Sequence, residues 1–97
     1  MSIWPFFDIF TNILVNILRM KLAQLGRNLK DSRKRRFPAD NLARFALRIG
    51  VSRATLQKME QGDLSVSMEK YYRASRLLGL EREFEQLLRL PRSLFDD

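Results

Sequence analysis

The sequence of 97 residues contains no cysteine and no histidine. Without cysteine the chain can form no disulfide and offers no thiol nucleophile. Without histidine it lacks the most common general base and metal ligand, and it cannot assemble a serine–histidine–aspartate triad. No glycine-rich phosphate loop or cluster of metal-ligating residues takes their place. We therefore expect a protein that is not an enzyme and that has no catalytic residues, metal, cofactor or small-molecule ligand.

Acidic residues are also scarce. Eleven of them stand against 18 lysines and arginines, which gives a formal net charge of +7 and a pI of about 10.6. The excess is concentrated in residues 19–36, where the only acid is Asp31 and the basic residues are Arg19, Lys21, Arg27, Lys30, Arg33, Lys34, Arg35 and Arg36. A small basic domain favours a polyanionic partner, first of all nucleic acid. The alternative is that this run is a solvated helix face or a poorly ordered linker.

The one long apolar run, residues 3–18, does not fit a membrane span or an export signal. At ~1.5 Å per residue its sixteen residues cover roughly 24 Å, less than the ~30 Å hydrocarbon core of a bilayer. A secretory signal carries its positive charge before the apolar run, whereas here the basic cluster follows it. We therefore expect a cytoplasmic protein.

The same run predicts an amphipathic helix, for which Pro5 suits the first helical position. The apolar positions at helical spacing are Phe6, Phe7, Phe10, Ile13, Leu14, Ile17 and Leu18, and the polar stripe is Asp8, Asn12, Asn16 and Arg19. Such a wide apolar face must be covered by its own domain, a second subunit, a partner protein or a membrane surface. Another interpretation is that translation begins at Met20.

Helical spacing of apolar residues continues through the rest of the chain, and no alternating run indicates a strand. Glycine and proline end the successive stretches, at Pro38, Gly50, Gly62, Gly79 and Pro91. The helices are expected at about residues 21–36, 39–49, 53–61, 68–78 and 81–90. The sequence thus predicts an all-α, five-helix domain over residues 20–97, preceded by the helical extension of residues 1–19.

The apolar positions also predict which side of each helix is buried. In the first helix of the domain Leu22, Leu25 and Leu29 should face inward and the basic residues outward. The fourth helix should be capped by Ser67. The last helix should bury Phe84, Leu87 and Leu88. Tyr71 or Tyr72 should cover the core.

Residues 46–62 have the pattern of a helix-turn-helix. Gly50 allows the positive φ of the sharp turn, Val51 fills the angle between the helices, and Ser52 caps the second helix. Leu56 and Met59 should pack that helix onto the preceding one. Its outward side would then carry Arg53, Ala54, Gln57 and Lys58. The alternative is a structural helix hairpin that binds no ligand.

The sequence resembles the XRE (Cro/C1-type) helix-turn-helix family, and within it the HipB-like regulators. The likeness covers about residues 22–90, through Gly50-Val51-Ser52-Arg53-Ala54-Thr55-Leu56, Glu60-Gln61-Gly62-Asp63, Val66-Ser67-Met68 and Arg76-Leu77-Leu78-Gly79-Leu80. It implies a lambda-repressor-like fold. The stretch before Gly50 is about two residues longer than the family pattern, and the glutamine that commonly opens the second helix is not recognisable.

The resemblance also implies roles for six residues of the motif. Arg53, Ala54 and Lys58 would face base edges with Gln57 close by, while Ser52 and Thr55 would approach phosphates. These residue types suit the task, because arginine or lysine bonds guanine, glutamine pairs with adenine, and an alanine methyl touches a thymine methyl. Glu60 is expected to be structural.

The leading functional hypothesis is a sequence-specific transcriptional repressor that binds operator DNA as a homodimer. The HipB-like resemblance extends this to the antitoxin of a toxin–antitoxin operon, with a HipA-like kinase toxin as partner. One alternative is an interaction module whose N-terminal helix binds or inhibits another protein without specific DNA contact. Another is attachment of residues 5–18 to a membrane surface. The acidic residues Glu81, Glu83 and Glu85 are interpreted as a solvated face.

Overall fold

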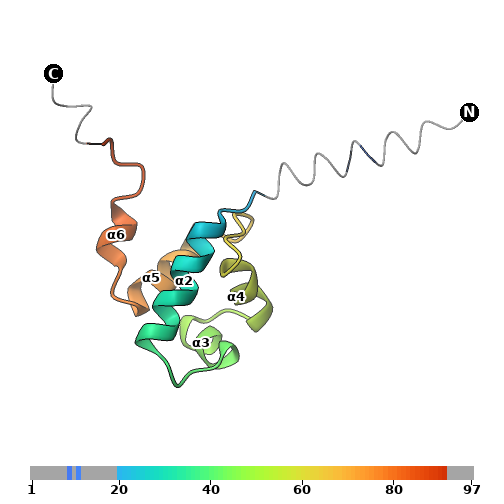
Figure 1. Ribbon diagram of the computed structural model, residues 1–97, viewed down its shortest axis with the longest axis vertical. Coiled ribbons are helices and arrows are strands. Elements are labelled where there is room, and N and C mark those ends of the chain that lie inside the picture. The colour runs from blue at the N-terminus through green and yellow to red at the C-terminus, as the bar shows by residue number, and fades with distance from the viewer. Residues whose placement is uncertain (1–8, 10, 12–19, 92–97) are drawn as a thin grey trace, which may run out of the picture.

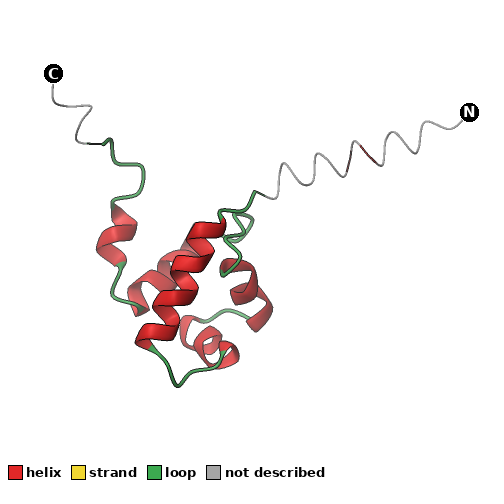
Figure 2. Ribbon diagram, viewed as in Figure 1, coloured by secondary structure: helices red, strands yellow, loops and turns green. Residues whose placement is uncertain are grey.

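The computed structural model describes residues 9, 11 and 20–91, and the rest of the expected helix over residues 1–19 lies outside this part of the chain. Five helices follow one another: α2 (Ala23–Arg36), α3 (Leu42–Ile49), α4 (Arg53–Met59), α5 (Met68–Leu77) and α6 (Glu81–Glu85). Figures 1 and 2 show α2 lying across the other helices, with α4 on one side of it and α6 on the other. Within the described residues there is no strand, so the prediction of an all-α fold is confirmed.

The core lies where α3, α4 and α5 meet beneath α2. Its largest fully buried side chains are Phe45, Leu56 and Met59, and the other buried apolar residues are Leu29, Ala46, Ile49, Tyr71, Ala74 and Leu78. Each large apolar side chain taken out of water contributes about 1.5–3 kcal/mol. The interlocking of α3 with α4 through these residues is the packing that the sequence predicts.

Two glycines allow the backbone of α2 and the chain before it to touch the end of α4. A Cβ atom on Gly26 would lie 2.3 Å from the backbone oxygen of Glu60, and one on Gly62 would lie 1.8 Å from the oxygen of Leu22. Gly62 also has a positive φ of 74°. These approaches leave room for hydrogen only, so glycine is required at both positions.

The chain before α2 pairs with the loop after α4. Lys21 and Asp63 form an isolated antiparallel bridge. The Leu22 N–H donates to the Gly62 carbonyl at 2.8 Å, and the Leu64 N–H donates to the Met20 carbonyl at 3.0 Å. Figure 1 shows this start of the domain beside the loop that follows α4. Residues 20–22 are thereby tied to the last part of the helix-turn-helix.

Three sequence expectations are wrong in detail. Leu22 is exposed, because the chain at this point pairs through its backbone with Gly62. The helix expected from residue 39 begins at Leu42, since Asn41 caps it. The last helix ends at Glu85, and Leu87 and Leu88 are exposed, because only Phe84 reaches a neighbour, the ring of Tyr72 at 5.3 Å.

The other expectations about burial and capping agree with the structure with one exception. Tyr71 covers the core as expected. Ser67 is the N-cap residue of α5, but its side chain makes no capping hydrogen bond. Among the described helices none is both long and apolar enough to cross a membrane.

We predict that Gly26→Ala destabilises the protein although alanine is the better helix former. In an open helix position alanine gains about 1 kcal/mol over glycine. Here the Cβ would meet the backbone of Glu60 and Gly62 at 2.3 and 2.5 Å, so we expect a loss of about 1–3 kcal/mol. Urea unfolding measures the difference. Asn28→Ala, on the exposed side of α2, is the control and should be neutral or slightly stabilising. If Gly26→Ala were as stable as the parent, the close approach of the Gly26 backbone to Glu60 and Gly62 would be contradicted.

Candidate nucleic-acid interface

The turn between α3 and α4 is closed by backbone hydrogen bonds around Gly50. The Val51 N–H donates to the Ala46 carbonyl at 3.0 Å and the Gly50 N–H to the Leu47 carbonyl at 3.2 Å, which is a Schellman arrangement. Gly50 has a φ of 73°, as the sequence predicts. Val51 packs against the core. The angle between the two helices is therefore set by main-chain bonds.

Ser52 fixes the start of α4. Its hydroxyl oxygen accepts from the Thr55 N–H at 3.0 Å and its O–H donates to the Thr55 hydroxyl at 2.9 Å. This satisfies one of the free N–H groups at the start of the helix. Leu56 and Met59 then bury the inner side of α4 completely. The capping bond disfavours fraying of the first turn. Rotation of the helix would expose Leu56 and Met59.

The outer side of α4 gathers the residues that the sequence singles out. Ser52, Arg53, Ala54, Gln57 and Lys58 are exposed, and Thr55 is half-buried against Ser52. Within the described part of the chain Arg53, Gln57 and Lys58 form no side-chain hydrogen bond or ion pair. Two cations and an amide thus stand on a rigid helix with their donors unused. We call these six residues the α4 face.

The end of α4 is held by a buried ion pair that the sequence does not predict. Arg33 of α2 donates from Nε to Glu60 Oε2 at 2.6 Å and from Nη2 to Oε1 at 3.1 Å. The two side chains are 8% and 9% exposed. Arg33 was expected on the outward basic side of its helix, and this expectation is wrong because Glu60 draws it inward. The expected structural role of Glu60 agrees with this contact.

Of the remaining basic residues of α2, Arg35 is exposed, and the other four lie on two flanks of this contact. On one flank Arg36 reaches over the turn before α6, with Nη2 2.9 Å from where a Cβ of Gly79 would lie. The other flank has Arg27, Lys30 and Lys34 at helical spacing, all exposed and without an ion pair among the described residues. The sequence therefore predicts this basic surface correctly except at Arg33.

The start of α3 is built from residues that sequence reasoning missed. Asn41 accepts from the Arg44 N–H at 2.8 Å and is the cap that opens the helix. Asp40 pairs with Arg48, and this hydrogen bond lowers the pKa of the Asp40 carboxyl. The Arg48 guanidinium also lies 5.1 Å from the centre of the Phe37 ring. The available signal was an asparagine directly before Leu42, the first residue of the apolar-periodic stretch.

The loop after α4 is also fixed. The Asp63 carboxylate accepts from the Ser65 N–H at 2.8 Å, and hydrogen bonding from the side chain and then from the backbone of Ser65 lowers the pKa of Asp63. The Tyr71 O–H donates to the Asp63 carbonyl at 2.6 Å. Burial raises the pKa of Tyr71 to about 12, so the phenol keeps the proton that it donates. The α4 face is thus bounded by ordered backbone on both sides.

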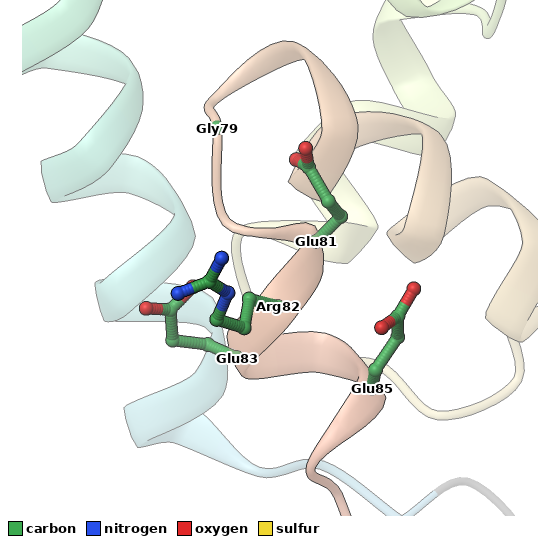
Figure 3. A pocket seen from close by; sticks show the side chains of 5 residues that line it. All are labelled: Gly79, Glu81, Arg82, Glu83 and Glu85. Atoms are coloured by element: carbon green, nitrogen blue, oxygen red, sulfur yellow. The ribbon is translucent and has the colours of Figure 1, made fainter.

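The acidic residues of α6 do not form a second site. A shallow hollow beside this helix is lined by Gly79, Glu81, Arg82, Glu83 and Glu85. In Figure 3 Glu83 and Arg82 extend to one side of the helix, whereas Glu81 and Glu85 point elsewhere. The described residues contain no group of three or more side chains that could hold a metal ion. This geometry offers no convergent carboxylates for chemistry.

The geometry is that of a helix-turn-helix: two packed helices, a glycine turn, and a second helix with its outer side free. A family model described as helix-turn-helix matches residues 41–84, from the cap of α3 into α6. The match covers 44 of the 97 residues, and residues 41–84 are therefore similar to a helix-turn-helix domain. Comparisons with curated proteins and with solved structures found no match.

We predict that the buried Arg33–Glu60 pair contributes much more to the free energy of unfolding than an exposed ion pair does. Arg33→Met strands the Glu60 carboxylate in the interior and should cost about 3–5 kcal/mol of unfolding free energy. The double variant Arg33→Met with Glu60→Leu should recover most of this loss. Arg73→Met is the matched control, since it removes the exposed pair with Glu69 and should change stability by less than about 1 kcal/mol. Equal effects of the two single variants in urea unfolding would refute this assignment.

Proposed function

We propose that the protein is a sequence-specific transcriptional repressor that inserts α4 into the major groove of operator DNA. The observation that carries the proposal is the α4 face, on which Arg53, Gln57 and Lys58 are exposed with unused donors. The first turns of such a helix are the part that reaches base edges in this class of domain.

The side chains suit direct reading of bases. Arginine can donate two bonds to the O6 and N7 acceptors of guanine, and glutamine can bond the N7 and N6 of adenine. Ala54 adds a methyl group that can contact a thymine methyl. Ser52 and Thr55 at the start of the helix are placed to approach the flanking phosphates. The expected half-site therefore contains a guanine opposite Arg53.

Phosphate attraction would come from the flank of α2. Arg27, Lys30 and Lys34 have no ion-pair partner among the described residues, so their charge is available to the DNA backbone. Such contacts give affinity without sequence preference. In this proposal α4 determines the sequence specificity, and α2 adds affinity that does not depend on sequence.

Repression would follow from occlusion of a promoter by a homodimer. One recognition helix touches only a few base pairs, too few to select a promoter among genomic competitors. Two copies on an inverted repeat double the sequence that is read. The resemblance to HipB-like regulators supports the finer proposal that the operon encodes a toxin of the HipA-like kinase type, with this chain as antitoxin and autoregulator.

We predict that Arg53→Ala weakens operator binding by about 1–3 kcal/mol and relaxes the preference at one base pair. The reason is the loss of a two-bond contact to a base edge. Fluorescence anisotropy with an operator duplex and with a scrambled duplex measures both effects. Arg82→Ala is the control, because it removes the same charge from α6, which lies on the opposite side of α2 from α4 in Figure 1. This variant should change neither the affinity for the operator nor the base preference. Specific recognition would be rejected if the parent protein bound operator and scrambled DNA with equal affinity and Arg53→Ala left both affinities unchanged.

Binding should also be strongly salt-dependent. A site with six to ten phosphate contacts loses roughly 10³–10⁵ in affinity between about 50 and 200 mM salt. Lys30→Ala and Lys34→Ala should each reduce the slope of log affinity against log salt by about one, with equal effects on operator and scrambled DNA. A slope that neither variant changes would show that α2 does not contact phosphates.

We further predict that the operator is an inverted repeat whose half-sites are centred about one helical turn apart, roughly 34 Å. Inserting half a turn between them should weaken binding of the dimer, because it rotates one half-site to the opposite side of the duplex. Selection from random duplexes followed by spacing variants tests this. Recovery of a single isolated half-site bound by one copy would contradict it.

A further inference from the structure

Leucines at and beyond α6 form an apolar surface on the outside of the domain. Leu80, directly before the helix, is 36% exposed, and Leu87 and Leu88, after it, are 52% and 99% exposed. Phe84 is half-buried. We call Leu80, Phe84, Leu87 and Leu88 the α6 surface. Figure 1 shows α6 and the chain after it on the opposite side of α2 from α4, so this surface is separate from the α4 face.

The backbone after α6 is close to a helix and is interrupted at Leu88. The N–H groups of Gln86, Leu87 and Arg89 each donate to the carbonyl three residues earlier, at 3.2, 3.1 and 3.2 Å. Leu88 has a φ of 66° and is the one non-glycine residue with a positive φ among the described residues. This conformation is disfavoured for leucine, and a side chain that is 99% exposed makes little contact that could compensate it. A change at this residue would let α6 continue to residue 90, because proline follows only at residue 91.

A helix that continued to residue 90 would be amphipathic. Phe84, Leu87 and Leu88 have the spacing i, i+3 and i+4, and Leu80 lies one turn earlier, so the four side chains would share one side. Phe84 contacts the ring of Tyr72 at 5.3 Å, and the two leucines lie beyond this contact. No described helix covers them. Because a helix this short is unstable alone, its completion requires a partner for the apolar side.

The charges beside this apolar side favour a second copy as the partner. Glu81, Glu85 and Arg89 are spaced four residues apart, and Figure 3 shows the two glutamates on the same side of α6. The charge along this row changes sign from one end to the other. Two such helices that run in opposite directions bring Arg89 of each copy beside Glu81 of the other, whereas a parallel pair brings like charges together. The row is therefore complementary to itself in the antiparallel arrangement.

The net charge favours the same contact. The chain carries +7, so two copies repel each other where basic surfaces meet. Residues 81–90 contain three acids and two arginines, which gives this segment a net charge of −1. Pairing through α6 therefore joins two copies where the repulsion is small, and it leaves the α4 face of each copy free.

The size of the α6 surface indicates a weak contact. A standard interface buries about 800 Å² on each partner, and four apolar side chains on one short helix supply less. Two copies held on adjacent half-sites have an effective concentration of about millimolar, at which a weak contact still forms. The pairing would therefore act mainly as cooperativity between two copies on DNA.

We propose that α6 continues to residue 90 when the α6 surfaces of two copies pair in opposite directions, and that this pairing joins the homodimer on the operator. The role of the homodimer rests on the proposed function. The inference adds the surface that joins the two copies and the change in backbone that accompanies their contact.

The first test is self-association of the full chain without DNA, in sedimentation equilibrium up to millimolar concentration. Arg89→Glu and Glu81→Arg each bring like charges together at both ends of the pair, so each should raise the dissociation constant about tenfold. An equimolar mixture of the two variants restores the opposite-charge contacts and should associate as tightly as the parent. Arg82→Glu is the matched control, because it makes the same change of charge on the other side of α6 (Figure 3) and should leave the dissociation constant unchanged.

Two results of this experiment would overturn the proposal. One is a parent chain that stays monomeric at millimolar concentration. The other is a dissociation constant that responds equally to Arg89→Glu and Arg82→Glu, or to neither.

Circular dichroism tests the change in backbone. The helical signal per residue should rise with concentration for the parent and for Arg82→Glu, and it should stay constant for Arg89→Glu over the same range. Leu88→Gly accepts the positive φ, weakens the helix and removes a contact, so this variant should stay monomeric with the helical signal of the dilute parent. Association of the parent without a rise in helical signal, or of Leu88→Gly as tightly as the parent, would contradict the proposal.

DNA binding separates this inference from the proposed function. Leu88→Gly should bind a duplex with one half-site as the parent does and should lose about tenfold in affinity for the inverted repeat. If the chain pairs through α6 but binds no DNA, the repressor is rejected and the pairing stands. If the chain binds the half-site and Leu88→Gly leaves the affinity for the inverted repeat unchanged, the pairing alone is rejected.

Discussion

The buried contact between the Arg33 guanidinium and the Glu60 carboxylate constrains the position of α4 more than any apolar contact does. Removing two ions from water costs several kcal/mol each, and only good geometry offsets it. The two parallel hydrogen bonds at 2.6 and 3.1 Å provide that geometry. Two helices that contact through apolar side chains alone can shift along each other at small cost. An ion pair with two parallel hydrogen bonds forms in one relative position only. The pair therefore specifies where α2 lies along the end of α4, and the close approach of Gly26 to Glu60 holds the two backbones in that register.

The recognition helix is consequently fixed at both ends. Gly50 and Ser52 set its beginning through backbone and capping bonds, and Glu60 sets its end. Helices of seven residues are unstable alone, so α4 exists only because its two ends and its inner side are held by the rest of the domain. Side chains on such a helix are presented without much loss of backbone freedom on binding, which favours affinity and discrimination together.

Local signals account for what could be predicted from the sequence. Gly50, Ser52, Leu56 and Met59 act within a few residues of one another, so spacing alone indicates the turn, the cap and the buried side. The Arg33 contact spans 27 positions, so no local pattern indicates Glu60 as the partner, although helical spacing places Arg33 four residues after Leu29 on the buried side of α2. The predictions that Leu22 and Leu88 are buried were wrong for a different reason. Both residues have the helical spacing of buried positions, but no described helix covers their side chains. Periodicity reports which side chains could be buried, and tertiary contacts decide which are.

The distribution of charge follows from the same contacts. With Arg33 neutralised by Glu60, the free positive charge of α2 lies on its flanks, and the α4 face adds Arg53 and Lys58. The acids Glu81, Glu83 and Glu85 lie on α6, which Figure 1 shows on the opposite side of α2 from α4. The free positive charge is therefore greater on the α4 side of the domain than on the α6 side, so the α4 side attracts a polyanion more strongly. Under the proposed function, such a field would orient the α4 face toward DNA during encounter and would raise the rate of binding.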